Sequence, residues 1–184
     1  KIRARLGPEE GDDKEAEILG RKIRWGEEGI EIEADQSHRK KIMEYFGLKE
    51  GCKGIAVNGD KDEKEEVGDE DGLEKSGVTE FRGIAARLNY LAQDSPDLLF
   101  PAKEVARDMA NPTVGAIRRV KKVAKYLCNR EAVVWKFVYQ EEGQEVEVWT
   151  DSDWGGSRRN RKSTSGGVVM WGKHCWKAWG STQG

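Results

Sequence analysis

The spacing of the apolar residues changes twice along this chain. Between residues 17 and 34 apolar and charged residues alternate, which is typical of strands that bury one face. From residue 79 to residue 127 the apolar residues recur at helical spacing, which predicts amphipathic helices. Residues 132–179 return to short β-rich runs separated by turns. In a chain of 184 residues, this order predicts an α+β fold made of one medium domain or two small ones.

The first strand-like region predicts a hairpin followed by a short helix. The turn of the hairpin is expected at residues 26–29, where two glycines flank two acids. The helix is expected over residues 37–46, capped by Asp35 or Ser37 and ended by Gly47. The apolar residues assigned to the first arm are Ile18, Ile23 and Trp25, and those assigned to the second arm are Ile30, Ile32 and Ala34. The apolar residues assigned to the helix are Ile42, Met43 and Phe46.

Residues 50–77 are expected to form an acidic, mobile linker. Glycine recurs through this segment, and acids predominate between residues 60 and 66. Such a segment has too little apolar surface to offset the entropy lost on ordering. Charged residues make up 36% of the whole chain, well above the usual quarter, so a thick central core is not expected.

Three helices are predicted after the linker. The first begins at a cap formed by Thr79, and the second opens at Pro96. The third spans residues 112–127 behind an Asn111 cap. Pro101 lies within the second helical pattern and is expected to kink or delay that helix. The first helix is expected to face the core with Phe81, Ile84, Leu88 and Leu91, and the second with Leu98, Ala102, Val105 and Met109. The third is expected to face it with Ile117, Val120, Ala124 and Leu127.

The C-terminal part of the chain predicts two pairs of strands. The expected strands are residues 132–139 and 145–150, joined by a turn at 141–143, and residues 166–171 and 174–179, joined at Gly172. A polar loop over residues 151–165 separates the pairs. Gly166 and Gly167 are expected to mark a bulge or close strand packing. Five of the seven tryptophans lie in the last 36 residues, so aromatic packing is expected to concentrate there.

The net charge of −2 conceals an asymmetry along the chain. Residues 1–77 hold 15 Lys and Arg against 22 Asp and Glu, whereas residues 78–184 hold 17 against 12. The positive charge gathers on the third predicted helix, and no acid lies between Met109 and Arg130. Such a face suits contacts to nucleic-acid phosphates without base reading, and the alternative is a solvated helix face. The candidate phosphate-binding residues on this helix are Arg118, Arg119, Lys121, Lys122 and Lys125.

A strand that ends in a carboxylate is the second candidate site. Asp151 follows a predicted strand and precedes a glycine turn, so its side chain is held rigidly yet reaches solvent, as a magnesium ligand must. Hydrolysis by two metal ions needs several carboxylates, and Asp153 shares a side with Asp151 only if the strand continues. The alternative is an Asx turn that closes a hairpin. The loop after the two acids carries a second basic cluster, formed by Arg158, Arg159, Arg161 and Lys162.

Other classes of site find little support in these residues. The cysteines Cys52, Cys128 and Cys175 are odd in number and widely spaced, which argues against a disulfide framework and for a reducing compartment. The cysteines and histidines make no zinc-ligand spacing. His174 is expected to be a packed histidine rather than a base. No apolar run approaches the roughly 18–20 residues of a transmembrane helix, and no apolar signal segment follows the basic start.

Several segments, in order, resemble motifs of copia-type LTR retrotransposon Pol polyproteins. Residues 81–92 (FRGIAARLNYLA) resemble "YR…GSLxYLA" of that family, and residues 119–127 (RVKKVAKYL) resemble "LKRVLRYL". Residues 150–156 (TDSDWGG) resemble "SDADWAG", and residues 161–167 (RKSTSGG) resemble "RKSTSGY". Shorter matches occur at residues 18–21, 29–32, 95–98, 109–113 and 179–183, so the resemblance covers about residues 15–183.

The resemblance implies the end of a reverse transcriptase followed by the opening of a ribonuclease H domain, incomplete at both ends. The implied segments are the end of the palm and start of the thumb (1–49), the linker (50–77), thumb-like and connecting helices that hold the template–primer duplex (78–130), and the first strands of a ribonuclease H-like mixed sheet (131–184). The family's first metal-ligand Asp maps onto Asp151, and Asp153 is not assigned that role.

The same resemblance implies a cofactor, partners and a location. Mg²⁺ is expected in the complete enzyme, with the polymerase Asp pair upstream and the remaining ribonuclease H carboxylates downstream. The parent is therefore expected to be an RNA-directed DNA polymerase with ribonuclease H activity, and this chain alone is expected to be inactive. The expected partners are an RNA–DNA hybrid or other nucleic acid and the rest of the Pol polyprotein, with no membrane. The expected location is intracellular and cytoplasmic, in a virus-like particle if the element is active.

Two alternatives to the enzyme fragment stay open at this point. One is a non-catalytic remnant that binds nucleic acid, and the other is a decayed transposon fragment without a stable fold. Four residues depart from the family pattern, namely Ser95, Pro101, Gly115 and Gly180. Pro101 and Gly115 fall inside predicted helices, where a proline costs about 3 kcal/mol and a glycine about 1 kcal/mol. These departures are either tolerated variation or decay.

Overall fold

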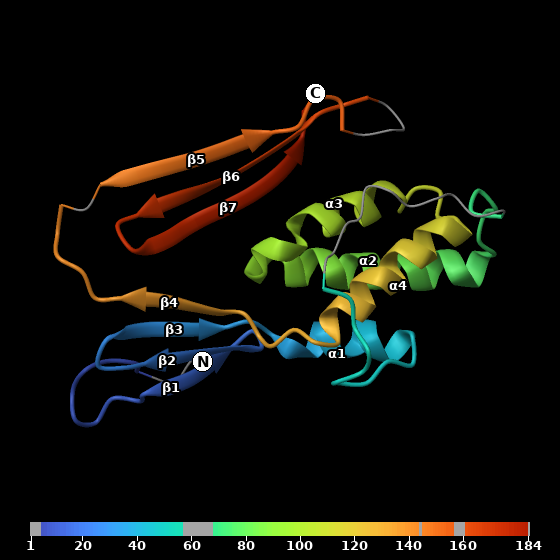
Figure 1. The fold of residues 1–184 in the computed structure, drawn as a ribbon. Coiled ribbons are helices and arrows are strands. Elements are labelled where there is room, and N and C mark those ends of the chain that lie inside the picture. Colours follow the sequence, from blue (N-terminus) through green and yellow to red (C-terminus); the bar gives the residue numbers. More distant parts are fainter. Residues whose placement is uncertain (1–4, 57–67, 144, 157–160, 184) are drawn as a thin grey trace. The chain divides into compact units, whose positions relative to one another are not determined.

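The computed structural model of this chain describes residues 5–56, 68–143, 145–156 and 161–183 (Figure 1). Helices and two antiparallel sheets both occur, which confirms the mixed α and β content expected from the sequence. The chain divides into two compact units: a helical unit, residues 36–131, and a sheet unit, residues 1–35 together with 132–184. These units cut across the four predicted segments, whose assignment to polymerase and ribonuclease H parts stays a prediction.

The first sheet of the sheet unit has the order β1–β2–β3–β4, with antiparallel neighbours. Its strands are β1 (Glu15–Ile18), β2 (Arg21–Trp25), β3 (Gly29–Glu33) and β4 (Val134–Val138). The predicted hairpin is confirmed as β2 and β3, with Trp25 opposite Ile30. The prediction that Ile18 lies on the same arm is wrong, because Leu19 and Gly20, with φ of 53° and 77°, turn the chain before β2 begins.

The fourth strand of this sheet comes from the far end of the chain. β4 pairs with β3, so that Trp135 lies opposite Ile32 and Lys136 lies opposite Glu31. The Lys136 ammonium and the Glu31 carboxylate form an ion pair at 3.1 Å. The predicted pairing of residues 132–139 with residues 145–150 is therefore wrong, because cross-strand contacts with β3 determine the partner of β4.

The second sheet consists of β5 (Val146–Ser152), β6 (Thr164–Trp171) and β7 (His174–Thr182), in that order. The predicted pair around Gly172 is confirmed. Strand β6 begins two residues earlier than predicted and β7 ends three residues later, whereas β5 is shifted to begin one residue later and end two residues later. Gly167 permits close packing, because a Cβ there would collide with the ring of Trp179. The irregularity in the pairing of β6 with β7 lies at Val169 and Met170 instead of at the two glycines.

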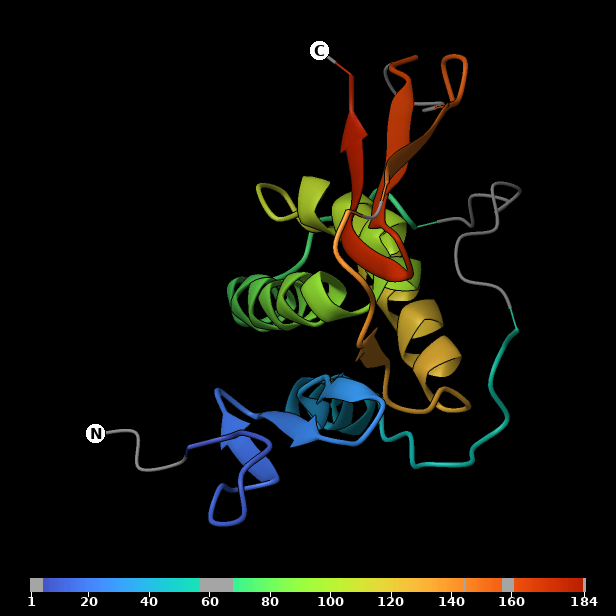
Figure 2. The same ribbon diagram turned by 90° about the vertical axis from the view of Figure 1, so that its left-hand side faces the viewer.

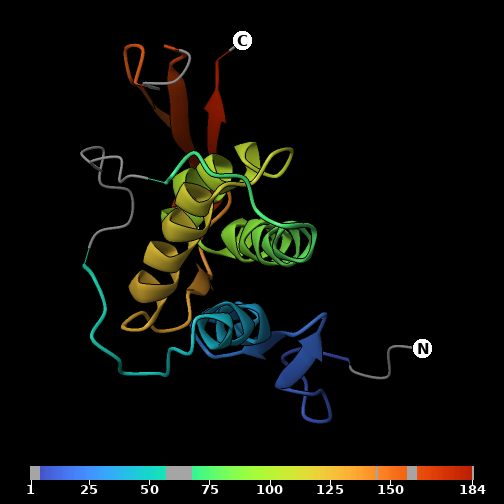
Figure 3. The same cartoon turned by 90° about the vertical axis from the view of Figure 1, so that its right-hand side faces the viewer.

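The described part of the helical unit contains α1 (Gln36–Tyr45), α2 (Lys75–Asp94), the 3₁₀ turn η1 (Pro96–Leu98), α3 (Leu99–Arg107) and α4 (Val114–Leu127). Figures 2 and 3, which look nearly along α1 and α2, show α4 running at an angle to both. The residues predicted to face the core from these helices are the ones that lie in it, which confirms the prediction. The fully buried side chains include Ile42, Met43, Phe81, Leu88, Leu98, Val105, Val120, Ala124 and Leu127, with Ile117, Met109 and Phe46 packed at the edge.

The starts of two helices differ from prediction. α2 begins at Lys75, so Thr79 lies inside it and donates its hydroxyl to the Lys75 carbonyl instead of capping the helix. α4 is capped by Thr113, whose hydroxyl accepts from the Ala116 N–H at 3.2 Å, and not by Asn111. Both errors arise because Ser, Thr and Asn are capping residues by type, and only the backbone geometry selects one of them.

The flanks of the predicted linker are packed against the helical unit. Ile55 and Leu73 contact the helical core, and the Leu73 N–H donates to the Pro112 carbonyl at 3.1 Å. The two flanks, residues 50–56 and 68–77, thus make packing contacts that the linker prediction did not include, and its central part, 57–67, lies outside the described residues. The few apolar residues of these flanks do not predict a core by themselves. They can pack nevertheless, because the helices already supply an apolar surface.

Cys52 and Cys128 form a disulfide within the helical unit, with Cα atoms 5.6 Å apart. The sequence argued against a disulfide framework, and this single pair was not predicted. The residues are 76 positions apart, and an odd number of cysteines excludes a fully paired set but not one pair. Burial raises the pKa of the remaining free cysteine, Cys175, so that its thiol stays protonated at neutral pH.

Two departures from the family pattern fit the helical unit. Pro101 lies in the first turn of α3, where its missing N–H leaves no hydrogen bond unmade. Gly115 lies in the first turn of α4, against residue 69: its N–H donates to the Asp69 carbonyl at 3.0 Å, and a Cβ would lie 3.1 Å from that oxygen. Glycine therefore permits this close approach, and neither residue signals decay of the fold.

Candidate nucleic-acid interface and carboxylate site

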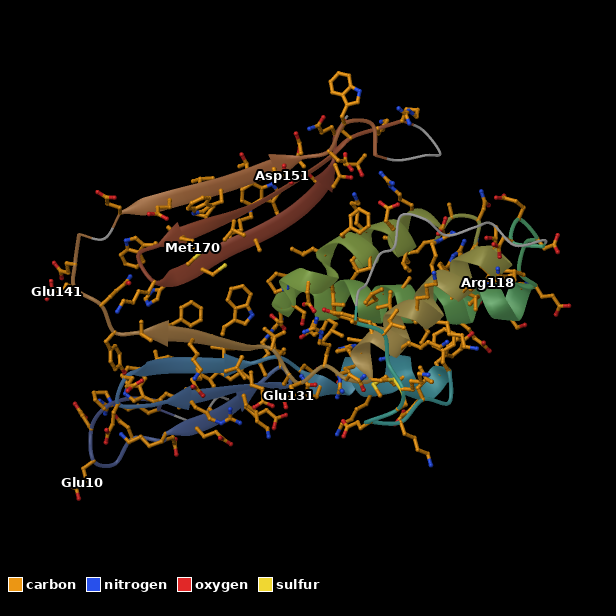
Figure 4. The ribbon with its side chains drawn as sticks, viewed as in Figure 1. Glu10, Arg118, Glu131, Glu141, Asp151 and Met170 are labelled. Atoms are coloured by element: carbon orange, nitrogen blue, oxygen red, sulfur yellow. A yellow bond between two sulfur atoms is a disulfide. The ribbon has the colours of Figure 1, made fainter. Side chains whose placement is uncertain are left out.

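Asp151 lies on the edge strand of the second sheet. The strand β5 continues to Ser152, so Asp151 is one residue inside the strand and not beyond its end. It faces Gly166 of β6, which in turn faces Gly180 of β7. Its side chain is exposed, and one carboxylate oxygen accepts the N–H of Ser152 at 2.9 Å (Figure 4). The carboxylate is thus held on a strand and open to solvent, as predicted.

Asp153 has a different role from Asp151. Its carboxylate accepts the N–H of Thr164, and its own N–H donates to the Thr164 carbonyl at 3.0 Å. Next to it, the Gly155 N–H donates to the Ser163 hydroxyl at 3.0 Å. These hydrogen bonds close the loop between β5 and β6. For Asp153, the turn-closing interpretation is therefore the one that fits its contacts.

The described residues do not by themselves make a magnesium site. Mg²⁺ prefers near-octahedral oxygen ligation, usually with one or two carboxylates and further ligands from water or phosphate. Within the described ranges, no group of three or more Asp, Glu, His and Cys side chains is arranged to hold a metal ion. Asp151 is therefore one possible ligand without a partner set in this part of the chain, and no catalytic step follows from it alone.

Two of the five basic residues on α4 form ion pairs with acids distant in sequence. Arg118 lies 2.6 Å from a carboxylate oxygen of Asp69, which precedes α2 (Figure 4). Arg119 donates to Asp108, at the end of α3, also at 2.6 Å. The absence of acids between residues 109 and 130 predicted an unbalanced face, but packing brings acids from other segments. No signal in the sequence of α4 itself identifies these partners.

Lys121 and Lys125 of α4 form a side of the helix that is open to solvent. Lys121 is exposed, Lys125 is partly exposed one turn further along the same side, and Lys122 is partly exposed beside them. Arg161 and Lys162, in the loop before β6, are also exposed. The other two candidates, Arg158 and Arg159, lie outside the described residues.

His174 is a packed histidine, as expected. Its Nε2 lies 2.7 Å from the Val138 carbonyl, and its ring makes edge contacts with Phe137 and Trp171. These contacts connect the start of β7 with β4, the last strand of the first sheet. The imidazole therefore serves packing and hydrogen bonding within the sheet unit. No helix in the described part of the chain is long and apolar enough to cross a membrane.

Comparison with known proteins finds relatives among the Pol polyproteins of plant transposons. The chain is 28% identical over 105 residues to the retrovirus-related Pol polyprotein from transposon RE1 of Arabidopsis thaliana, a match that covers 56% of this chain. It is 31% identical over 98 residues, or 52% of this chain, to the corresponding polyprotein from transposon RE2 of the same plant. An uncharacterized mitochondrial protein of Arabidopsis thaliana, AtMg00810, is 28% identical over 90 residues.

These matches cover only a small part of the two polyproteins. The matched region is 7% of the RE1 polyprotein, 6% of the RE2 polyprotein and 36% of AtMg00810. No protein-family model matches the chain. No solved structure matches it either. The relatives nevertheless confirm the resemblance inferred from the sequence: this chain is similar to a segment of a retrotransposon Pol polyprotein.

Proposed function

We propose that this chain is the part of a copia-type Pol polyprotein that joins the end of a reverse transcriptase to the start of a ribonuclease H domain, and that it binds an RNA–DNA hybrid. The observation that carries the proposal is the pair Lys121 and Lys125, open to solvent one turn apart on α4, in a chain similar to Pol polyproteins. Lysines at this spacing suit successive phosphates and read no bases.

The position of Asp151 supports the ribonuclease H part of the proposal. The resemblance implies that residues 131–184 contain the first strands of a ribonuclease H-like sheet with the first metal-ligand Asp. A three-stranded sheet that presents an exposed Asp151 carboxylate on its first strand is compatible with that role. Mg²⁺ binding in the complete enzyme, and location in the cytoplasm or a virus-like particle, belong to the same proposal.

The test of hybrid binding is its dependence on salt. The logarithm of the affinity of the full chain for an RNA–DNA hybrid is expected to fall linearly with the logarithm of salt concentration. The double variant Lys121→Gln/Lys125→Gln is expected to reduce the slope by about one to two units, since each lost phosphate contact removes roughly 0.9.

A charge-matched control separates phosphate contact from net charge. Lys22 and Lys177 are exposed lysines of the sheet unit, on β2 and β7. The double variant Lys22→Gln/Lys177→Gln removes the same charge and is expected to leave the slope nearly unchanged. Equal slopes for wild type and the α4 variant, or an equal reduction in the control, would contradict the proposed interface.

The role of Asp151 predicts no cleavage by this chain alone. One carboxylate cannot organise two metal ions, so incubation of the purified chain with Mg²⁺ and a hybrid is expected to leave the RNA strand intact. Magnesium-dependent cleavage that disappears in Asp151→Asn would overturn this expectation. A cooperative unfolding transition of the chain is expected as well, and its absence would favour the decayed fragment instead.

A further inference from the structure

Residues 51–54 lie against the C-terminal end of α4, next to the lysines of the proposed interface. The Gly51 N–H donates to the Cys128 carbonyl at 3.3 Å. A Cβ on Gly54 would lie 2.7 Å from the Lys125 carbonyl oxygen and 2.8 Å from Nδ2 of Asn129. The segment therefore follows the last turn of α4 at backbone contact, and a side chain at position 54 would separate the two.

Lys53 is the charged residue of this segment. It is exposed, while its neighbour Cys52 is bonded to Cys128, just after α4, and its neighbour Gly54 lies against the Lys125 carbonyl of α4. Residues 51–56 contain no acid. The preceding acid, Glu50, forms an ion pair with the buried Arg39 at 3.0 Å. Lys53 thus lies, exposed, in a segment whose backbone contacts the last turn of α4 near Lys125, and residues 51–56 supply no carboxylate to offset its charge.

The disulfide is the covalent tie between this segment and the helix. Residues 49–56 form no helix or strand, so no backbone ladder fixes them. The Gly51 hydrogen bond, the ion pair of Glu50 with Arg39 and the packing of Ile55 on the core hold the segment, and the bond from Cys52 to Cys128 attaches it covalently to the end of α4.

We propose that Lys53 belongs to the same phosphate-binding face as Lys121 and Lys125, and that the Cys52–Cys128 disulfide holds it there. The ligand is the phosphate backbone of a nucleic acid, and the inference rests on the proposed function in that respect. It adds a residue 72 positions from Lys125 to the interface, and it makes the strength of binding depend on the redox state of one cysteine pair.

The two sulfurs differ in access, which determines how the bond exchanges. Cys128 is buried and Cys52 is partly exposed, so an external thiolate attacks the sulfur of Cys52 and Cys128 leaves as a thiolate, which takes up a proton. A second external thiolate then releases Cys52, and two external thiols become one external disulfide. The Cys128 sulfur lies 3.5 Å from the Ala124 carbonyl, which accepts its S–H in the reduced chain.

The experiment is a thermodynamic cycle on hybrid binding by the full chain. In the oxidised chain, Lys53→Gln is expected to reduce the salt slope by about one unit. Lys41→Gln, an exposed lysine on α1, removes the same charge and is the matched control, with no expected change. Reduction with glutathione, or the variant Cys52→Ser, is expected to weaken binding about three- to tenfold, as one lost phosphate contact does.

The decisive arm is the combination of the two changes. In the Cys52→Ser chain, Lys53→Gln is expected to have almost no further effect, because Lys53 has already left the face. If the losses of affinity caused by Cys52→Ser and Lys53→Gln simply add, the disulfide does not hold Lys53 in the interface. If Lys53→Gln leaves the salt slope of the oxidised chain unchanged, Lys53 is not a phosphate contact, and this result holds even if reduced chains unfold. If Lys121→Gln/Lys125→Gln still reduces the salt slope, either result leaves the proposed function in place. If none of these variants changes the slope, both the proposed function and the role of Lys53 are overturned.

Discussion

The helical unit and the sheet unit place their apolar side chains in different surroundings. In the helical unit, side chains from all four α-helices share one core, and Phe81 and Leu88 are fully buried. In the described part of the sheet unit, Ala34 is the one fully buried apolar side chain, whereas Trp149 is 66% and Trp154 is 95% exposed. Helices bury a stripe against one another, but a sheet has two faces, and each needs a covering layer.

The difference teaches that the two units depend on different interactions. The helical unit is expected to depend on the volume of individual core side chains, and the sheet unit on strand pairing and on close contacts between strands. One chain allows both to be followed, because residues 36–131 contain no tryptophan and all seven tryptophans belong to the sheet unit. Tryptophan fluorescence therefore reports the sheet unit, and helical circular dichroism reports the helical unit.

The largest expected effect is in the helical core. Phe81→Ala is expected to lower the free energy of unfolding by about 3–5 kcal/mol, because a large cavity opens between packed helices. Urea unfolding followed by circular dichroism measures the loss. The matched change Val148→Ala, on the exposed strand β5, is expected to cost less than about 0.5 kcal/mol by tryptophan fluorescence. A comparable loss for Val148→Ala would break the comparison.

The next effect tests close strand packing in the sheet unit. Gly167→Ala is expected to cost about 1–3 kcal/mol, because its Cβ would collide with the Trp179 ring and lie 2.6 Å from the Trp149 carbonyl oxygen. Gly166→Ala is the control, since its Cβ would approach no atom of another strand more closely than 3.5 Å. Tryptophan fluorescence during unfolding should separate the two variants. Equal losses would mean that strand propensity, and not packing, sets the cost.

A smaller effect concerns a hydrogen bond inside the helical unit. Tyr126 on α4 donates its hydroxyl to Asp97 in η1 at 2.7 Å. Tyr126→Phe is expected to cost about 1 kcal/mol at neutral pH in chemical unfolding followed by circular dichroism. No loss would show that the hydroxyl exchanges this bond for water without penalty.

The same tyrosine predicts the pH dependence of that loss. Burial first, and then the bond to Asp97, raise the pKa of Tyr126. The folded state therefore binds the phenol proton more tightly than the unfolded state. This contribution is fully present below the unfolded pKa of about 10 and disappears as the pH rises through the folded pKa. The difference between wild type and Tyr126→Phe should shrink in that window, and a constant difference would exclude the linkage.

The smallest expected effect compares two helical glycines. Gly83→Ala on α2 is expected to stabilise the helical unit by about 0.5–1 kcal/mol, since a Cβ there meets nothing within 4 Å. Gly115→Ala on α4 should gain less or destabilise, because its Cβ would press on Asp69. Thermal unfolding by circular dichroism should rank Gly83→Ala above wild type and Gly115→Ala below Gly83→Ala. A higher melting temperature for Gly115→Ala than for Gly83→Ala would mean that the segment around Asp69 shifts at little cost to make room for the Cβ.

Local patterns predicted the elements better than their partners. The helical spacing of Phe81, Ile84 and Leu88 identified the buried face of α2, because a helix repeats its geometry over a few residues. The start of the same helix was missed, since Thr79 is a capping type but Lys75 begins the helix. The Asp151 carboxylate was also predictable from its strand, whereas the loop-closing contacts of Asp153 with Thr164 needed two strands in register.

The sequence by itself determined the alternation of strand-rich and helical regions, the core faces of the helices, the lysine-rich side of α4 and the similarity to Pol polyproteins. The tertiary structure alone decided which distant residues meet: β4 with β3, Cys52 with Cys128, Arg118 with Asp69 and Arg119 with Asp108. The physical reason is range. Periodicity and capping act within one or two turns, whereas these contacts depend on how the elements pack, which no short window of sequence encodes.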